Sequence, residues 1–572
     1  MSNLTVVPSQ TAVHIAVDPS ESANVSPSLA LWSSRALVLL ALAAQVVIAL
    51  RFWQLTWDDS AITLGFSRTF AFTGRVEPTP GSGIVEGYST TLWMLIMAAA
   101  AKVISSPSAL LTFAKLSTLV LNLANILLIR RWLSTWTTET LANLTAGIVG
   151  CTLMFYETIN GMETPLIMAL VLAMLLLLPS NSRRARLAYI LAGSALLLTR
   201  WEAAWFLVPF LFAEYSFQNL RRIIAPALTW ASVFFVSNLI RWRYFGQILP
   251  NTILAKQNAP YSLPSRRLAL ENHLMEPVHI LASMKVLLLL LFAFTFYNYF
   301  VAPRPTRLLQ PLRESWQLRF TNIFTLFALI LSTAIGPNWG PQFRSFYPAW
   351  PFLIALLLLP VIPNLKPKTL GWITVALCLA TIGRMGARIQ PLRSEKAPLY
   401  MPRITVDRVA VAAPILTNLE QITHQPILTY AAPDMGAIML YTTNIHVIDL
   451  GLLCDPVLAR QGFRAIQPYV LDQRHPDVIE IHEVFTEMTK LDSYPEFLSN
   501  YTPVYIHGIR FFLRRNLLAK IPPSALTERP FLPDGHPQPA ETEAFHRFNA
   551  PYPDKPADYA LNQRFGSYLV LN

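Results

Sequence analysis

The sequence predicts a multi-span α-helical membrane protein with a small α/β domain at its C-terminal end. Hydrophobic residues make up 53% of the chain and charged residues 14%, and the mean hydropathy is +0.40, unlike a typical soluble enzyme. Apolar runs recur as far as Ile382, after which the composition becomes mixed. Short basic segments separate alternate runs, as expected for cytoplasmic loops between membrane helices.

The N-terminal part of the chain divides into a tail and a membrane domain. Residues 1–30 are rich in Ser, Pro, Thr and Val without hydrophobic periodicity, which predicts a flexible cytoplasmic tail. Residues 31–384 are the predicted membrane domain, because a helix that crosses hydrocarbon needs about 20 mostly apolar residues. About eleven candidate spans follow, some of them short: Ala36–Trp53, Phe113–Ile129, Thr140–Phe155, Thr164–Leu178, Arg186–Leu198, Ala203–Ala213, Ile223–Ile240, Val278–Phe300, Arg319–Ile335, Phe346–Ile362 and Thr369–Ile382.

The apolar run Thr91–Ile104 is short and is followed by Ser105, Ser106 and Pro107. If this run does not cross, all the short basic loops lie on one side, which the positive-inside rule identifies as cytoplasmic. We therefore predict a surface-lying or re-entrant helix here. The basic residues concerned are Arg130, Arg131, Arg183, Arg184, Arg186, Arg221, Arg222, Arg304, Arg307, Arg313, Lys366 and Lys368.

The same topology brings five loops together at the outer face of the membrane, along with the C-terminal domain. These loops contain Asp58, Glu163, Arg200, Asn251 and Arg344. One catalytic cavity can form there, built from outer loops and helix ends. A transporter would instead place its polar groups near mid-membrane within broken helices.

Residues 385–572 are the predicted extracytoplasmic α/β domain. The segment Ile521–Pro556 is rich in Pro, His and charged residues, which predicts a long loop. Asp434 and Asp449 flank a strand-loop-strand unit, where they either close turns or contact a glycan acceptor. The predicted strands are Pro426–Tyr430, Ile445–Leu450, Asp477–Ile481 and Tyr568–Leu571.

Charge and cysteine content narrow the range of partners. The net charge is +12, but much of the excess lies in the short cytoplasmic loops, so nucleic acid is not an expected partner. Cys151 and Cys378 fall in predicted spans and Cys454 stands alone, which leaves neither a disulfide framework nor a zinc set. We expect no cofactor; a divalent metal is compatible with phosphate chemistry, but no ligand cluster implies one.

The first candidates for chemistry are Asp58 and Asp59, which follow the first apolar run. An acidic pair is costly to keep near lipid, and a carboxylate can accept a proton from a sugar hydroxyl. The alternatives are that one or both cap a helix beginning near Ala61, or that they form ion pairs. Adjacent side chains point in different directions, so the sequence does not decide which of the two is the base.

Further candidates are ligands for sugar and phosphate. Glu86 and Glu163 can hold sugar hydroxyls, or pair with Arg68, Arg75 or Arg200 in structural salt bridges. Among the outer-side cations, Lys256 and Arg344 are the expected phosphate contacts, and Arg200 has Glu202 as an alternative partner. Snorkelling to lipid headgroups is the competing explanation for these cations. Aromatic residues nearby, among them Tyr88 and Trp339, fit an interfacial belt, with stacking on a sugar ring as the alternative for one or two.

Five segments together resemble the bacterial GT-C superfamily of polyprenyl-phosphate-dependent membrane glycosyltransferases, and within it the group of the mycobacterial terminal arabinofuranosyltransferase. The chain departs from the usual pattern at Thr91 and Trp201, where proline is usual, and at Asn338, where aspartate is usual. The segments are Asp58-Asp59-Ser60 with Val85–Trp93, Asn160–Thr164, Leu198–Glu202, Tyr244–Gly246 with Leu249–Thr252 and Ala255–Lys256, and Gly336–Trp339 with Arg344. The segments Ala432–Ala437 and Val447–Leu450 also look like that group.

The resemblance implies a glycosyltransferase at the outer face of the bacterial inner membrane. The donor would be a polyprenyl-phosphate-linked sugar and the acceptor a cell-envelope glycan or glycolipid, with a single inverting displacement and Asp58 or Asp59 as base. The alternatives are a polyprenyl-lipid or solute transporter, and a non-catalytic glycan-binding or assembly protein. The expected substrate-binding residues are Glu86, Tyr88, Glu163, Arg200, Asn251, Lys256, Asn338, Trp339 and Arg344.

Overall fold

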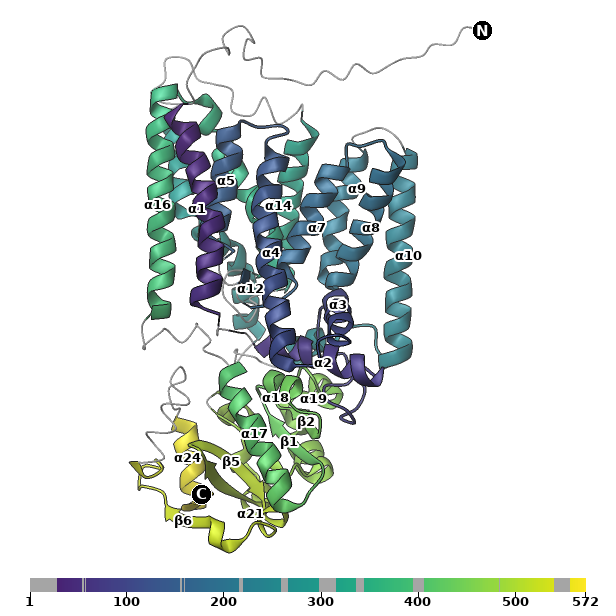
Figure 1. Cartoon of the computed structure of the whole chain (residues 1–572), viewed down its shortest axis with the longest axis vertical. Helices are drawn as coiled ribbons and strands as arrows, with labels where there is room; N and C mark the ends of the chain where they lie inside the picture. Colours follow the sequence, from purple (N-terminus) through teal and green to yellow (C-terminus); the bar gives the residue numbers. More distant parts are fainter. Residues whose placement is uncertain are drawn as a thin grey trace.

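The computed structural model describes residues 28–53, 56, 58–154, 157–158, 160–215, 220–258, 266–297, 315–335, 344–393, 406–482, 484–539 and 556–571. An upright helical bundle forms its upper part, and a domain containing a mixed β-sheet lies below it (Figure 1). The end of the bundle on which this domain sits is called the domain end. The predicted combination of apolar helices and a C-terminal sheet is therefore present.

Six helical segments of the described chain are long and apolar enough to cross a membrane. The helices α12 (Arg266–Ala282) and α13 (Lys285–Phe296) meet at a 70° bend and make a seventh crossing if they are counted as one span. The six are α1 (Leu29–Arg51), α4 (Pro107–Leu133), α10 (Leu220–Phe245), α14 (Trp316–Ile335), the run of η5 (Arg344–Ala349), α15 (Trp350–Leu358) and η6 (Ile362–Asn364), and α16 (Pro367–Arg393).

Four other predicted spans are helical but shorter: α5 (Glu139–Thr152), α7 (Thr164–Leu177), α8 (Arg183–Thr199), and α9 (Leu207–Tyr215) with the preceding η2 (Glu202–Phe206). They stand within the bundle beside the longer helices (Figure 1). Every residue of α5 except Glu139 is buried. A Cβ at Gly147 of α5 would lie 2.6 Å from the Leu37 side chain of α1, so glycine permits this close helix contact.

Two short helices lie between the bundle and the C-terminal domain: α2 (Asp58–Thr73) and α3 (Thr91–Ala101) (Figure 1). At 1.5 Å per residue, the 11 residues of α3 extend about 16 Å, roughly half the hydrocarbon thickness. That length agrees with the prediction that the run Thr91–Ile104 does not cross. The short helix α11 (Asn251–Asn258) follows α10.

The C-terminal domain contains a seven-stranded sheet in the order β2-β1-β3-β5-β4-β7-β6. Pairing is parallel for β1 with β2, β1 with β3, and β4 with β7, and antiparallel for the remaining neighbours. The strands are β1 (Leu428–Ala432), β2 (Ile445–Asp449), β3 (Val478–Ile479), β4 (Tyr501–Ile506), β5 (Ile509–Arg514), β6 (Leu526–Pro530) and β7 (Ser567–Leu571).

Helices connect and flank this sheet. They are α17 (Val406–Thr423), α18 (Gly436–Tyr441), α19 (Pro456–Gln461), η7 (Gly462–Ala465), η8 (Ile466–Arg474), α20 (Val484–Thr489), η9 (Leu491–Ser493), α21 (Pro495–Asn500), α22 (Arg515–Leu518), η10 (Pro523–Ala525) and α24 (Pro556–Phe565). The helix α16 continues to Arg393, past the predicted domain boundary at residue 384.

The strands expected from sequence are confirmed as β1, β2, β3 and β7, and three others were not expected. The hairpin of β4 and β5 turns at His507 and Gly508, both with positive φ, as a two-residue turn requires. The prediction of one continuous loop over Ile521–Pro556 is wrong at Leu526–Pro530, because β6 pairs with the distant β7.

The C-terminal domain is packed tightly against α2. A Cβ at Gly65 of α2 would lie 2.6 Å from the Cβ of Met439 in α18, and Arg68 donates to the carbonyl of Leu440 at 2.9 Å. The loop after α2 also covers the edge strand β2, where Thr79 donates to the carbonyl of Ile445. One hydrophobic core contains residues of α2, α3, α4 and the sheet, so the domain and the lower part of the bundle form one packed unit.

Candidate functional site

Asp58 and Asp59 form the first turn of α2, where negative charge is favourable next to the free N–H groups of the helix. The helix thus begins at the pair itself rather than near Ala61. Oδ1 of Asp58 accepts a hydrogen bond of 2.8 Å from the backbone N–H of Gly436, at the start of α18. The side chain of Asp58 thus bonds to the first N–H group of α18, and not to a helix that begins near Ala61, as the capping alternative expected.

Asp59 has a more open position. Its side chain is 45% exposed, and its Oδ2 lies 3.3 Å from Nη1 of Arg344 at the start of η5. A carboxylate that is both accessible and beside a guanidinium can accept a proton close to a group that binds phosphate. The two adjacent aspartates therefore have different surroundings.

The electrostatic environment of Asp58 disfavours its charged form. Desolvation raises the pKa of Asp58 well above its usual range, and the negative charges of Asp434, Asp59 and Asp449 raise it further. The hydrogen bond from Gly436 lowers this pKa but does not outweigh those effects. Asp58 is buried and bonded to Gly436, whereas Asp59 is accessible and lies beside Arg344, so Asp59 is the better candidate for the base.

Glu163 is the centre of a buried ion-pair network. Its Oε1 accepts bonds of 2.8 Å from both Arg200 and Arg344, and its side chain is inaccessible to solvent. Desolvation favours the neutral form, but the charges of Arg344 and Arg200 outweigh it and lower the pKa of Glu163. Arg200 also donates to Glu202 at 2.6 Å, and Arg344 donates to Thr164 at 3.2 Å. The expected pairing alternatives for Glu163 and Arg200 are thus both present.

A second acid, Glu157, belongs to the same cluster and was not identified from sequence. It is buried and accepts a 3.0 Å hydrogen bond from Asn160. Desolvation raises the pKa of Glu157, while the positive charge of Arg344 partly opposes the shift. Glu157 could have been identified from its position three residues before Asn160, in the same predicted outer loop as the candidate Glu163.

Glu86 makes a different ion pair from those expected. Arg241 donates two bonds to its carboxylate, of 2.6 and 3.0 Å, in the bidentate arrangement that arginine favours. The expected partners Arg68, Arg75 and Arg200 are not those of Glu86, because the fold brings α10 rather than α2 or α8 to this carboxylate. Tyr88, two residues after Glu86, is 4% exposed and packs edge-on against Phe66, so its ring lies in the core.

The remaining sequence candidates are less informative. Asn251 begins α11 as a buried residue, and its Oδ1 accepts a 2.6 Å hydrogen bond from Gln247. The side chain of Lys256, as well as Asn338 and Trp339, lie outside the described residues. Within the part of the chain that is described, no three His, Cys, Asp or Glu side chains are arranged to hold a metal ion.

The two acids of the C-terminal domain have separate roles. Asp449 is buried and accepts 2.7 Å hydrogen bonds from the backbone N–H groups of Gly451 and Cys454, so it closes a turn. Asp434 lies 3.3 Å from Nε2 of His482, whose Nδ1 is 2.9 Å from Glu480. The turn-closing explanation thus fits Asp449, whereas Asp434 belongs to a carboxylate-histidine pair close to Asp58.

The burial of Asp449 predicts a pH dependence of stability. Desolvation raises the pKa of Asp449 to about 7, against 3.8 for the ordinary group. The folded state therefore holds a proton that the unfolded state loses first, so this contribution to stability is complete below pH 3.8 and decreases as the pH rises to about 7. We expect the unfolding temperature of Asp449→Asn to fall less over this interval than that of the unsubstituted protein, as measured by scanning fluorimetry. Parallel curves for the two proteins would contradict the assignment.

No protein-family model and no curated protein matches this sequence.

Proposed function

We propose that this protein is a glycosyltransferase that moves a sugar from a polyprenyl-phosphate donor to a cell-envelope glycan or lipid-linked acceptor. The observation that carries the proposal is the contact between Asp59 and Arg344 at the domain end of the bundle. An accessible carboxylate and a guanidinium lie together there, between helices of membrane-spanning composition and a folded domain. A lipid-borne phosphate and a glycan can approach such a place from opposite sides.

The proposed reaction is a single displacement with inversion. The acceptor hydroxyl oxygen attacks the anomeric carbon while Asp59 takes the hydroxyl proton, and the bond between that carbon and the phosphate oxygen breaks. The lipid phosphate leaves with the electron pair of the broken bond. Arg344 offsets the negative charge that develops on the leaving group. Glu163 holds Arg344 in place through their 2.8 Å ion pair.

The number of crossings and the orientation are parts of the same proposal. We propose about eleven crossings, with the shorter bundle helices included, and the domain end facing the outside of the bacterial inner membrane. In support, α7 leads away from Glu163 and α8 returns to Arg200, so the basic start of α8 lies at the opposite end. Arg35, Arg130 and Glu139 also lie together at this end, opposite the C-terminal domain. Arginines at that end fit the positive-inside rule if it faces the cytoplasm.

This orientation predicts the result of reporter fusions. A reporter that is active only in the cytoplasm should be active when fused after Arg131 or after Arg222, and inactive when fused after the C-terminal domain. A periplasmic phosphatase reporter at the same positions provides the complementary control. An external location for either of the first two fusions would overturn the proposed orientation.

The direct test of the function is transfer by the purified protein. The full chain is reconstituted in nanodiscs with polyprenyl-phosphate pentoses or hexoses and with envelope glycan fragments as acceptors. We expect a glycosylated product and free polyprenyl phosphate in equal amounts. Movement of the intact sugar-lipid without cleavage would identify a transporter, and binding of glycan with an unchanged donor would identify a non-catalytic protein.

A further inference from the structure

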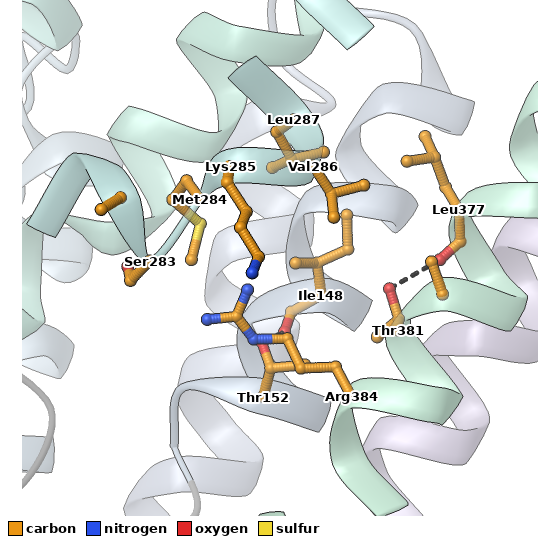
Figure 2. A pocket seen from close by; sticks show the side chains of 12 residues that line it. Ile148, Thr152, Ser283, Met284, Lys285, Val286, Leu287, Leu377, Thr381 and Arg384 are labelled. Carbon is orange, nitrogen blue, oxygen red and sulfur yellow. Dashed lines mark hydrogen bonds between the residues drawn. The ribbon is translucent and has the colours of Figure 1, made fainter. Parts of the chain in front are cut away.

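A cavity of about 470 Å³ lies within the bundle, and neither Asp59 nor Arg344 is among the residues that line it (Figure 2). It is lined by residues of α5, of α16 and of the bend between α12 and α13, and it is partly open to the outside of the bundle. Its walls are largely apolar and include Ile148 of α5, Met284 and Leu287 at the bend, and Leu377 of α16. A space with such walls accommodates hydrocarbon.

Two cationic side chains enter this cavity. Lys285 begins α13 and Arg384 lies in α16, and Figure 2 shows their charged groups pointing toward one another. No acidic residue is among the described residues that line the cavity. Two converging positive charges repel each other, and Arg384 is in addition partly buried among apolar side chains, whereas Lys285 is exposed. An anion placed between the two cations would offset their mutual repulsion and would replace the missing solvation of Arg384.

The position of Arg384 along its helix corresponds to the depth of lipid headgroups. It lies about 25 Å along the axis from Pro367, where α16 begins, at 1.5 Å per residue. That distance places it close to the end of the membrane-spanning segment Pro367–Ala387, on the side of the C-terminal domain. A snorkelling arginine would extend toward water, whereas this side chain is directed at Lys285.

The cavity also adjoins surfaces that face the bilayer. Val286, one of its lining residues, is exposed, as are Leu289 and Phe292 on α13 and Leu379 on α16. Large apolar side chains on the outside of a membrane bundle contact lipid tails. A ligand can therefore enter from the bilayer and keep the rest of its hydrocarbon chain on these exposed faces.

We propose that this cavity binds an anionic phospholipid of the surrounding bilayer, with its phosphate between Lys285 and Arg384. Arg384 can donate to two phosphate oxygens at once, and Lys285 adds a point charge. The start of an acyl chain lies against Ile148, Leu287 and Leu377. This site is separate from the Asp59–Arg344 contact, and it does not depend on the proposed transferase activity.

The test measures lipid retention by the intact chain. The protein is exchanged into nanodiscs that contain equal amounts of phosphatidylglycerol and phosphatidylcholine, and the bound lipids are counted by native mass spectrometry after release. We expect one phosphatidylglycerol to be retained in at least tenfold preference to phosphatidylcholine. The double variant Lys285→Gln, Arg384→Gln should lose this preference, and Arg51→Gln, which removes an exposed arginine at the same end of the bundle, should keep it.

Charge-conserving variants separate binding from folding. Lys285→Arg with Arg384→Lys keeps both charges, so we expect it to retain phosphatidylglycerol at no less than half the level of the unsubstituted protein. Equal retention by the glutamine and the charge-conserving variants would overturn the proposal. Preferential displacement of the retained lipid by polyprenyl phosphate, or by inorganic phosphate, would overturn the assignment to a phospholipid.

Discussion

Replacing Asp59 with asparagine is expected to lower the rate of sugar transfer by about 10²–10⁴-fold, the usual contribution of a general base. The substitution keeps the shape of the side chain and removes both its ability to accept a proton as a carboxylate and the negative charge that faces Arg344. The half-exposed position of Asp59 makes a large loss of stability unexpected. The measurement is the initial rate of acceptor glycosylation in nanodiscs, with the unfolding temperature recorded for the same samples.

The matched control is Asp58→Asn at the neighbouring position. Asparagine keeps an oxygen that can accept the hydrogen bond from Gly436, and it removes a carboxyl group whose pKa is already raised by desolvation. We expect this variant to fold normally and to retain activity within a few-fold. Full activity of Asp59→Asn, or loss of activity in Asp58→Asn alone, would assign the base elsewhere.

Replacing Glu163 with glutamine is expected to destabilise the protein by about 3–5 kcal/mol, the usual cost of leaving a buried charge without its partner. Both Arg200 and Arg344 bond to the buried carboxylate of Glu163, although Arg200 keeps Glu202 and Arg344 keeps the more exposed Asp59 as second partners. The change should also lower the transfer rate, because Arg344 loses the contact that positions it beside Asp59. Thermal unfolding in a single detergent measures the loss of stability, and the nanodisc transfer assay measures the loss of rate.

A matched control for the Glu163 substitution lies at the end of the bundle opposite the C-terminal domain. Glu139 also bridges two arginines, Arg35 and Arg130, but their side chains are 36–42% exposed. Because water solvates such groups, we expect Glu139→Gln to cost less than about 1 kcal/mol. If the two glutamine variants unfold at the same temperature, burial does not determine the strength of the Glu163 network.

Much of the helical framework follows from composition along the chain, because the predicted spans fall on helical segments of the described residues, although Val278–Phe300 covers parts of two helices that meet at a 70° bend. The short strand β1 was also predictable from its apolar residues and flanking turns. The hairpin of β4 and β5 was not, since Pro503 lies inside β4 and proline argues against a strand. The strand β6 ends at Pro530 in a polar segment, and only its pairing with β7 identifies it.

The partners within the candidate site depended on tertiary structure. The sequence placed Glu163 and Arg200 on the same side of the membrane, and this shared location made their pairing foreseeable. Glu86 instead pairs with Arg241, which is 155 residues away and was not among its expected partners. The difference between Asp58 and Asp59 arises from the packing of α18 against α2, which no local pattern encodes.

The close packing of α2 against α18 has a consequence for how the protein can be divided. Gly436 lies directly against the backbone oxygen of Asp58, and one apolar core includes Ala61, Phe66 and Ile438. Separating the C-terminal domain from the bundle would expose an apolar surface on each fragment. It would also remove the backbone N–H group of Gly436 that donates to Asp58. The C-terminal domain and the lower part of the bundle therefore form one folding unit, and we expect neither part to fold correctly when it is expressed without the other.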